Sequence, residues 1–251
     1  MSEHCLQLDV GNSSAKWRLM EMSADDSQSV VGRGTFVIES QQGLAEIRAA
    51  AKQASRVWLS SVAGTEKNAR LVSQLSLREG VHPWFASSTG RFGDLINSYH
   101  DPARMGVDRW LAMVAARNLT TQRCCVVDAG SALTIDWISQ AGQHEGGYII
   151  PGPALMERAL LLDTDKVRFD EAPDYQLSPG TSTAEAVRHG IALAQTGAVE
   201  LALRVAHFDE ATDRVFFTGG AGQMLADLTG HAASYSQDLV FEGLQLVAGK
   251  G

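Results

Sequence analysis

Two short segments place an aspartate, a glycine and hydroxyl side chains directly after an apolar stretch. The first consists of Asp9, Val10, Gly11, Asn12, Ser13, Ser14, Ala15 and Lys16. The second consists of Asp128, Ala129, Gly130, Ser131 and Ala132. Backbone N–H, hydroxyl and ammonium groups in such turns can hold a polyphosphate, and a carboxylate at a strand end can hold Mg²⁺.

Each of these segments taken alone is also typical of a plain hairpin turn. Their repetition is more informative, because Asp9 and Asp128 are separated by about half of the chain. The pair therefore indicates two duplicated domains that each contribute a phosphate-binding turn. A third Gly-rich segment, 218–222, follows the apolar run RVFFT. It matches neither a Walker A motif nor GxGxxG, so it is a weak signal when taken alone.

Strand and helix patterns alternate along the chain and predict an α/β fold. We predict strands over 5–10, 16–20, 30–38, 56–62 and 214–218, and a strand, a turn and a second strand over 123–139. Helices are predicted over 41–54, 66–79 and 182–206, from Gly106 onward and after Gly222. The segment 86–105 is predicted to be a loop. A boundary near residues 118–122 divides the chain into predicted domains 1–118 and 119–251.

The predicted helix over 182–206 has the clearest local signals. Ser182 and Glu185 form a capping-box pattern at its start. Apolar residues then recur at near-helical spacing, namely Val187, Ile191, Ala194, Ala198, Leu201 and Val205.

Composition narrows the class of protein. The formal net charge is −8 and no cluster of Lys and Arg offsets it, so nucleic acid is not an expected partner. No apolar run is long enough to span a membrane, and no signal-peptide pattern opens the chain, so we expect no membrane association and a cytoplasmic location. Cys5, Cys124 and Cys125 lack metal-site spacing and are expected to be buried and unpaired.

The three glycine-containing turns together resemble the superfamily of actin, sugar kinases and 70-kDa heat-shock chaperones. Further motifs resemble type III pantothenate kinases over nearly the whole chain: DxGN, GxDRW, D-x-G-[ST]-A-x-T-x-D from Asp128 to Asp136, GGYIIPG over 146–152, and T-x-GG. This resemblance implies two duplicated ribonuclease H-like, actin-type domains with an ATP cleft between them. It also implies ATP-dependent phosphorylation of pantothenate to 4′-phosphopantothenate, the first step of coenzyme A biosynthesis.

The resemblance further implies roles for individual residues. Asp108 would be the general base, and Arg109 would hold the pantothenate carboxylate. Asp128 would be the ligand of a monovalent cation, K⁺ or NH₄⁺, required besides Mg²⁺. The other implied contacts are Tyr99, Gly106, Val107 and Thr183 with pantothenate, and the first turn and Ser131 with ATP. A homodimer is expected from the family alone.

Other interpretations stay open at this point. Asp108 also suits the first turn of any helix, because the helix dipole favours an acid there. Tyr99 could be an ordinary loop residue, and Thr183 competes with Ser182 for capping. At the level of the whole protein, the alternatives are a kinase of the same superfamily acting on a sugar or acetate, a non-catalytic regulatory accessory factor, and a scaffold.

Overall fold

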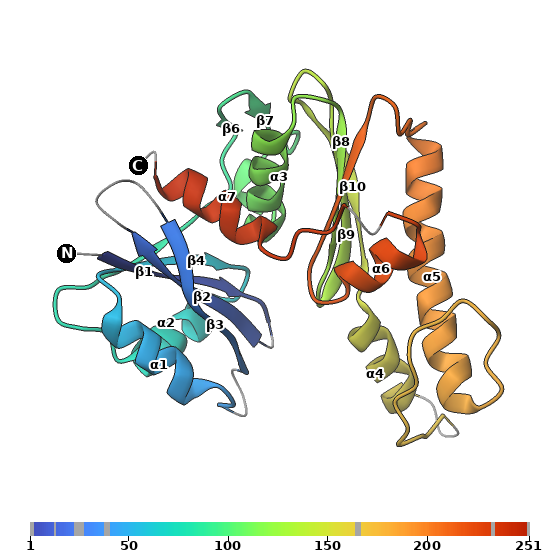
Figure 1. Ribbon diagram of the computed structural model, residues 1–251, viewed down its shortest axis with the longest axis horizontal. Helices are drawn as coiled ribbons and strands as arrows, with labels where there is room; N and C mark the ends of the chain where they lie inside the picture. Colours follow the sequence, from blue (N-terminus) through green and yellow to red (C-terminus); the bar gives the residue numbers. More distant parts are fainter. Residues whose placement is uncertain are drawn as a thin grey trace. The chain divides into compact units, whose positions relative to one another are not determined.

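The computed structural model describes residues 3–12, 14–22, 28–37, 41–163, 167–231 and 234–249. The chain forms two compact units (Figure 1). The first unit comprises Met1–Gly90, Tyr99–Ala115 and Val240–Gly251, and the second comprises Arg91–Ser98 and Ala116–Leu239. These contact-based units are not the same as the sequence ranges 1–118 and 119–251, and that domain division stays a prediction.

The first unit is built on a five-stranded sheet with the order β3-β2-β1-β4-β5. Its strands are β1 (Glu3–Val10), β2 (Ser14–Met22), β3 (Gln28–Val37), β4 (Arg56–Ser61) and β5 (Pro83–Phe85). The first three strands pair antiparallel, whereas β4 pairs parallel with β1 and with β5. The register places Val10 opposite Ala15, so the Asp9–Lys16 segment closes the β1–β2 hairpin.

Helices cover both faces of this sheet. On one face lie α1 (Leu44–Gln53) and α2 (Thr65–Leu75) (Figure 1). Their apolar residues form one buried cluster with Leu6, Leu8 and Val10 of β1. Side chains alternate along a strand, so the intervening positions of β1 point to the other face. There Arg18 Nε donates a hydrogen bond of 2.7 Å to Gln7 Oε1. The Arg18 guanidinium also lies over the ring of Phe241, which belongs to α7 (Leu239–Ala248).

The second unit repeats this topology around a four-stranded sheet with the order β10-β9-β8-β11. Its strands are β8 (Cys124–Ala129), β9 (Ala132–Ile138), β10 (His144–Pro151) and β11 (Arg214–Thr218). As in the first unit, three antiparallel strands are followed by one that pairs parallel with the first of them. This shared arrangement is what a duplicated domain requires.

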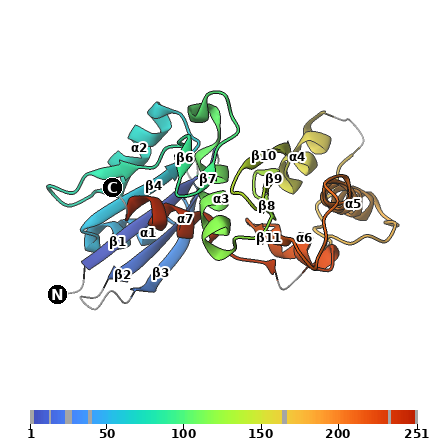
Figure 2. The ribbon, with the colours of Figure 1, turned by 90° about the horizontal axis from the view of Figure 1, so that it is seen from above.

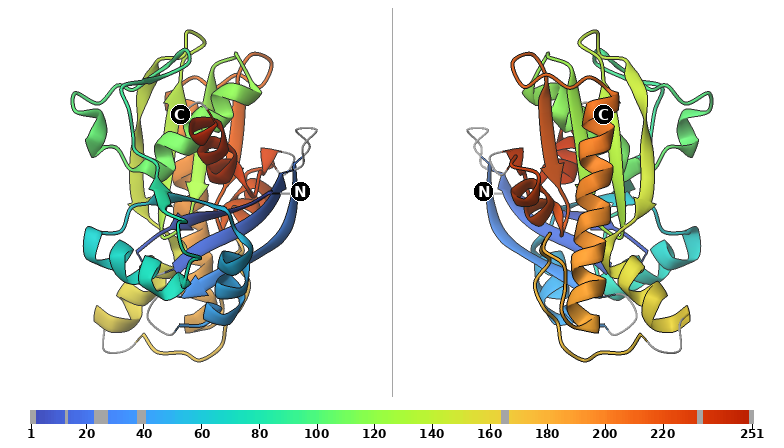
Figure 3. Two further views of the ribbon diagram at one scale, coloured as in Figure 1. Left: turned by 90° about the vertical axis from the view of Figure 1, so that its left-hand side faces the viewer. Right: turned by 90° about the vertical axis from the view of Figure 1, so that its right-hand side faces the viewer.

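The long helix α5 (Thr183–Val205) runs alongside this sheet (Figure 3). It is flanked by α4 (Pro153–Asp163) and α6 (Gly222–Leu228) (Figure 2). The buried core joins apolar residues of α5, among them Val199 and Leu203, to Val127 and Ile135 of the sheet and to Leu225 of α6.

Most predicted elements are present, with ends that shift by a few residues. The prediction of a plain loop over 86–105 is wrong in part, because this segment contains two two-residue strands, β6 (Arg91–Phe92) and β7 (Leu95–Ile96), and the 3₁₀ turn η1 (Pro102–Arg104). The helix expected from Gly106 is α3 (Val107–Leu119). The elements β5, β10, α4 and α7 were not predicted. Residue 38 of the third predicted strand lies outside the described residues.

Two further expectations concern α5 and the cysteines. Ser182 caps α5 as predicted, accepting from the Glu185 N–H at 3.2 Å. The apolar series is not one buried face, because Leu201 and Val205 are 49% and 59% exposed. All three cysteines are buried and free, as expected. Among the helices of the described residues, none is long and apolar enough to cross a bilayer.

Candidate active site

The turn between β1 and β2 is held by side chains from neighbouring elements. Gly11 N–H donates to the Ser14 carbonyl at 2.9 Å and closes the turn. Lys67, in the first turn of α2, donates from Nζ to the Asn12 carbonyl at 3.2 Å. Ser13, one of the predicted ATP contacts, lies outside the described residues.

Asp9 stands at the end of β1, where its carboxylate accepts a hydrogen bond of 3.0 Å from Ser60 Oγ. Burial and the nearby carboxylate of Asp108 raise the pKa of Asp9 to about 6, against the opposing effects of Ser60 and Lys16. The first turn and the GxDR segment are therefore electrostatic neighbours within the first unit. Two close carboxylates repel each other, and a bound cation or a shared proton relieves that repulsion.

Asp108 occupies the first turn of α3, and its Oδ1 accepts from the Arg109 N–H at 2.8 Å. A side chain at position 106 would collide with it, because an added Cβ would lie 2.6 Å from Asp108 Oδ1. Gly106 therefore leaves room for the Asp108 carboxylate to fold back over the helix start. The carboxylate of Asp108 stays partly exposed, which a proton acceptor for an external substrate needs.

Arg109 and Tyr99 form a second pair in the first unit. Arg109 Nη1 donates to the Tyr99 hydroxyl at 2.9 Å, and its guanidinium lies over the Tyr99 ring, 5.8 Å from the centroid. Arg109 is a buried cation, 5% exposed. A buried guanidinium with fixed geometry suits bidentate recognition of a carboxylate.

The second turn, between β8 and β9, is held by backbone groups. Gly130 N–H donates to the Ala132 carbonyl at 2.9 Å, and Gly152 N–H donates to the Ser131 carbonyl at 3.0 Å. An added Cβ at Gly152 would lie 2.3 Å from the Gly130 carbonyl oxygen, so only glycine fits against this turn. The Ser131 side chain remains exposed and can reach a ligand.

The Gly-rich segment after β11 lies directly against the second turn. Gly219 has a φ of +89°, and an added Cβ there would lie 2.4 Å from Asp128 Oδ1. The Ala221 N–H donates to the Ala129 carbonyl at 2.9 Å, and the Tyr235 hydroxyl donates to the Gly219 carbonyl at 3.4 Å. Asp128, Ser131 and the Gly-rich segment thus form one cluster in the second unit.

Thr183 stands apart from this cluster within the second unit. It lines an apolar hollow of about 480 Å³ between α4 and α5. The lining comprises Met156, Leu160, Val167, Thr183, Ala186, Val187, Gly190 and Ile191. Ser182 is the helix cap, so the Thr183 hydroxyl is not committed to capping.

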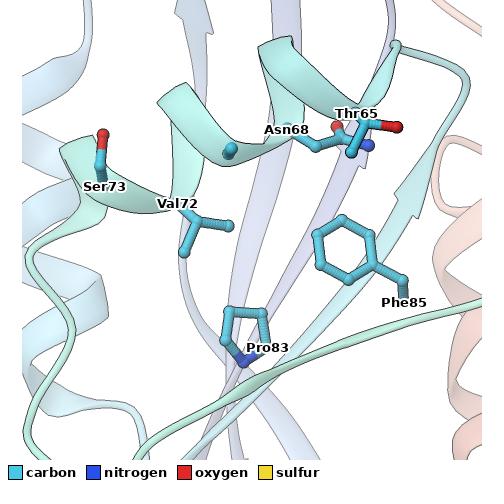
Figure 4. A pocket seen from close by; sticks show the side chains of 7 residues that line it. Thr65, Asn68, Val72, Ser73, Pro83 and Phe85 are labelled. Atoms are coloured by element: carbon cyan, nitrogen blue, oxygen red, sulfur yellow. The ribbon is translucent and has the colours of Figure 1, made fainter.

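A larger hollow of about 570 Å³ lies between α2 and β5 and contains none of the predicted site residues. Figure 4 shows the rings of Pro83 and Phe85 on the side of the hollow opposite α2, with Val72 and Asn68 projecting from the helix. Its lining is mostly apolar. It has no cluster of charged groups that could hold phosphates, so we do not assign it to catalysis.

The structure thus brings the predicted residues together in two groups. Asp9, Asp108, Arg109 and Tyr99 form the group in the first unit, and Asp128 and Ser131 form the group in the second. Thr183 belongs to the second unit but lines the separate hollow between α4 and α5. Sequence reasoning missed Ser60, Lys67, Gly152 and Tyr235, which contact the two turns. Only Gly152 carried a signal, as the last residue of GGYIIPG.

The donor chemistry fits hard cations better than zinc. In the described part of the chain, no three His, Cys, Asp or Glu side chains gather as a metal site. Isolated carboxylates beside Gly-containing turns match the oxygen ligands of Mg²⁺, which keeps several waters and shares its coordination with substrate phosphates.

Comparisons with known proteins show a family match over most of the chain. The family model described as type III pantothenate kinase matches residues 5–204. A curated type III pantothenate kinase from Hahella chejuensis is 35% identical over 243 residues, covering 97% of this chain and 96% of its own.

Two solved structures share the fold. One, described as a Baf family transcriptional activator from Campylobacter jejuni, has a TM-score of 0.58 and 24% identity, covering 98% of both chains. The other, described as a 2-dehydro-3-deoxygalactonokinase from Sinorhizobium meliloti, has a TM-score of 0.54 and 12% identity, covering 97% of both chains. The fold is therefore the duplicated α/β fold of actin-like sugar kinases, and the chain belongs to the type III pantothenate kinase family.

Proposed function

We propose that this protein transfers the γ-phosphoryl group of ATP to the 4′-hydroxyl of pantothenate, giving 4′-phosphopantothenate and ADP in the first step of coenzyme A biosynthesis. The observation that carries the proposal is the start of α3. There a partly exposed Asp108 lies near Asp9, and the next residue, Arg109, is a buried cation that is held by Tyr99. A proton acceptor thus adjoins a carboxylate-binding group, and pantothenate carries both a hydroxyl and a carboxylate.

Asp108 acts as the general base in this proposal. Its carboxylate accepts the proton of the pantothenate hydroxyl as that oxygen forms a bond to the γ-phosphorus and the bond to the ADP oxygen breaks. A positioned base contributes about 10²- to 10⁴-fold to such a step. The rest of the catalysis is positioning and charge stabilisation, because phosphoryl transfer needs little covalent chemistry from the protein.

Arg109 orients the substrate by binding the pantothenate carboxylate, and Tyr99 fixes the guanidinium for this task. Gly106 and Val107 complete the segment, the former by leaving room for Asp108. Thr183 and the apolar hollow between α4 and α5 offer a hydroxyl beside an apolar surface, which suits the dimethyl-substituted part of pantothenate.

The two turns bind the ATP phosphates. Backbone N–H groups and hydroxyls of the Asp9–Lys16 turn, with the Lys16 ammonium, supply positive and hydrogen-bonding groups, and Ser131 adds a hydroxyl from the second turn. Asp9 would hold Mg²⁺, which neutralises charge that develops on the phosphates. Asp128 would bind a monovalent cation, K⁺ or NH₄⁺, with its carboxylate beside Gly219.

The enzyme is expected to be a homodimer. The outward side of α5 exposes Leu193, Leu201 and Val205, and β10 exposes Tyr148 and Ile149. Exposed large apolar side chains such as these are available for contact with another chain. Three buried free thiols suit the reducing cytoplasm, where we place the enzyme. Pantothenate and ATP are the only partners proposed, without nucleic acid or membrane.

The direct test measures ATP consumption with pantothenate, Mg²⁺ and K⁺, and identifies the product by mass spectrometry. Turnover should require pantothenate and fall when Na⁺ replaces K⁺. ATP binding without pantothenate-dependent turnover would contradict the proposed substrate. Equal turnover in Na⁺ and K⁺ would contradict only the cation site at Asp128.

A further inference from the structure

A buried carboxylate–imidazole pair in the second unit reaches the residue that precedes Tyr99. Asp136 Oδ1 lies 3.0 Å from His144 Nε2, and His144 Nδ1 lies 2.8 Å from Ser98 Oγ. The side chains of His144 and Asp136 are 0% and 2% exposed. A carboxylate only accepts hydrogen bonds, so His144 Nε2 donates to Asp136. His144 Nδ1 and the Ser98 hydroxyl share the second hydrogen bond, whose direction depends on the form of the imidazole.

The backbone just before Ser98 is docked on the same unit. Ile96 N–H donates to the Gly142 carbonyl at 2.8 Å. Arg117 and Asp94 form an ion pair of 2.6 Å nearby. Position 142 must be glycine, because its φ is +80° and an added Cβ would lie 2.5 Å from the Asp94 carbonyl oxygen. These contacts therefore hold the backbone that precedes Ser98 on the second unit.

The Asp136–His144 pair also accounts for a conspicuous part of the sequence. Asp136 ends the motif that begins at Asp128, and none of the proposed steps of the reaction uses it. Gly147 makes room for its carboxylate, since an added Cβ there would lie 2.3 Å from Asp136 Oδ1. The Asp136 carboxylate is buried, and its pairing with His144 offsets the cost of that burial.

We propose that Asp136, His144 and Ser98 are positioning residues for Tyr99, and through it for the guanidinium of Arg109. Ser98 is covalently joined to Tyr99, whose hydroxyl accepts from Arg109 Nη1 at 2.9 Å. Holding Ser98 restricts the backbone from which the Tyr99 ring projects. This inference rests on the proposed function, and it predicts an effect on pantothenate binding rather than on the phosphoryl-transfer step.

The test compares Ser98→Ala with the wild-type enzyme, since Ser98 is exposed and its replacement leaves the core intact. We expect the KM for pantothenate to rise about 2- to 10-fold, the effect of one hydrogen bond, while kcat and the KM for ATP stay unchanged. Ser98→Thr, which keeps the hydroxyl, should restore the wild-type KM. Ser55→Ala is the matched control, because Ser55 Oγ donates to the His4 carbonyl at 3.1 Å at an exposed position remote in sequence from every proposed site residue.

A double-variant cycle decides whether Ser98 acts through Tyr99. In the Tyr99→Phe background, Ser98→Ala should add almost nothing to the KM, because the coupled element is already lost. If the double variant raises the KM for pantothenate by the product of the two single-variant increases, the inference is overturned. An unchanged KM in Ser98→Ala would overturn it as well. So would a raised KM that Ser98→Thr fails to reverse and that accompanies a lower melting temperature. If wild-type enzyme turns over pantothenate and Ser98→Ala behaves identically, only this inference fails; if wild-type enzyme ignores pantothenate, the proposed function fails as well.

Discussion

The turns after Asp9 and after Asp128 follow the same strand–turn–strand plan, yet different kinds of groups brace them. Side chains brace the first turn, with the Lys67 ammonium on the Asn12 carbonyl and the Ser60 hydroxyl on the Asp9 carboxylate. Backbone N–H groups of Gly152 and Ala221 brace the second. A lysine side chain can move aside when phosphates arrive, whereas a backbone contact without room for a methyl group cannot. The first turn is therefore built to adapt, and the second to stay fixed.

The two aspartates differ as well. Asp9 lies near the Asp108 carboxylate, whereas the Asp128 carboxylate lies against the backbone of Gly219. Proton acceptance and divalent-cation binding accordingly belong to the first unit in our proposal. The rigid second turn suits a monovalent cation, which needs fixed oxygen ligands more than a high local charge.

The largest expected effect comes from removing the Asp108 carboxylate, which tests whether proton acceptance belongs to the first unit. Asp108→Asn should lower kcat by about 10²- to 10⁴-fold, because no group then accepts the proton of the hydroxyl. The fold should survive, since the side chain is partly exposed, and the circular dichroism spectrum should match that of the wild type. Steady-state kinetics checks the loss, and a kcat close to the wild-type value would remove Asp108 from the role of base.

A second substitution tests whether the Asp128 turn is as rigid as its contacts indicate. Gly152→Ala brings a Cβ within 2.3 Å of the Gly130 carbonyl oxygen. We expect a loss of about 1–3 kcal/mol in the free energy of unfolding and a rise in the KM for ATP, measured by urea denaturation and kinetics.

Gly64→Ala at the start of α2 is the control for this substitution, because an added Cβ there meets nothing within 4 Å. It should change stability by less than about 0.5 kcal/mol. Similar effects of the two substitutions would refute the contrast between an adaptable and a fixed turn.

The smallest expected effect is the pH dependence of stability that Asp9 contributes. Its pKa is raised from 3.8 to about 6, so between these values the unfolded chain has lost the proton that the folded protein keeps. The unfolded state then binds fewer protons, and the free energy of unfolding falls as the pH rises through this window. Above pH 6 the full reduction in the free energy of unfolding remains.

Asp9→Asn should remove this loss of stability. The change in the free energy of unfolding from pH 4 to pH 7.5 should therefore be more favourable in Asp9→Asn than in the wild type, by on the order of 1 kcal/mol. Asp108→Asn should remove part of the same loss, because it deletes one of the two causes of the raised pKa. Urea denaturation at both pH values measures these differences. Identical pH profiles for all three proteins would show that the Asp9 pKa is not raised in the folded protein. A profile of Asp108→Asn that matches the wild type while that of Asp9→Asn differs would show that the two carboxylates do not interact.

Local patterns were sufficient where neighbouring residues determine the structure. Ser182 and Glu185 predicted the start of α5, and RVFFT predicted β11 with its observed bounds. They failed for α4, α7 and the short strands β6 and β7. They also failed for the outward side of α5, because apolar spacing cannot distinguish a side that faces its own sheet from one that remains exposed.

The two aspartate turns, the GxDR segment, the α/β class and the family follow from the amino-acid sequence, because each depends on residues close together in the chain. Which groups surround those residues depends on tertiary contacts. Lys67 on the first turn, Gly152 on the second, and His144 between Asp136 and Ser98 come from distant parts of the chain. Such contacts depend on how strands pair and helices pack, and no local spacing encodes that geometry.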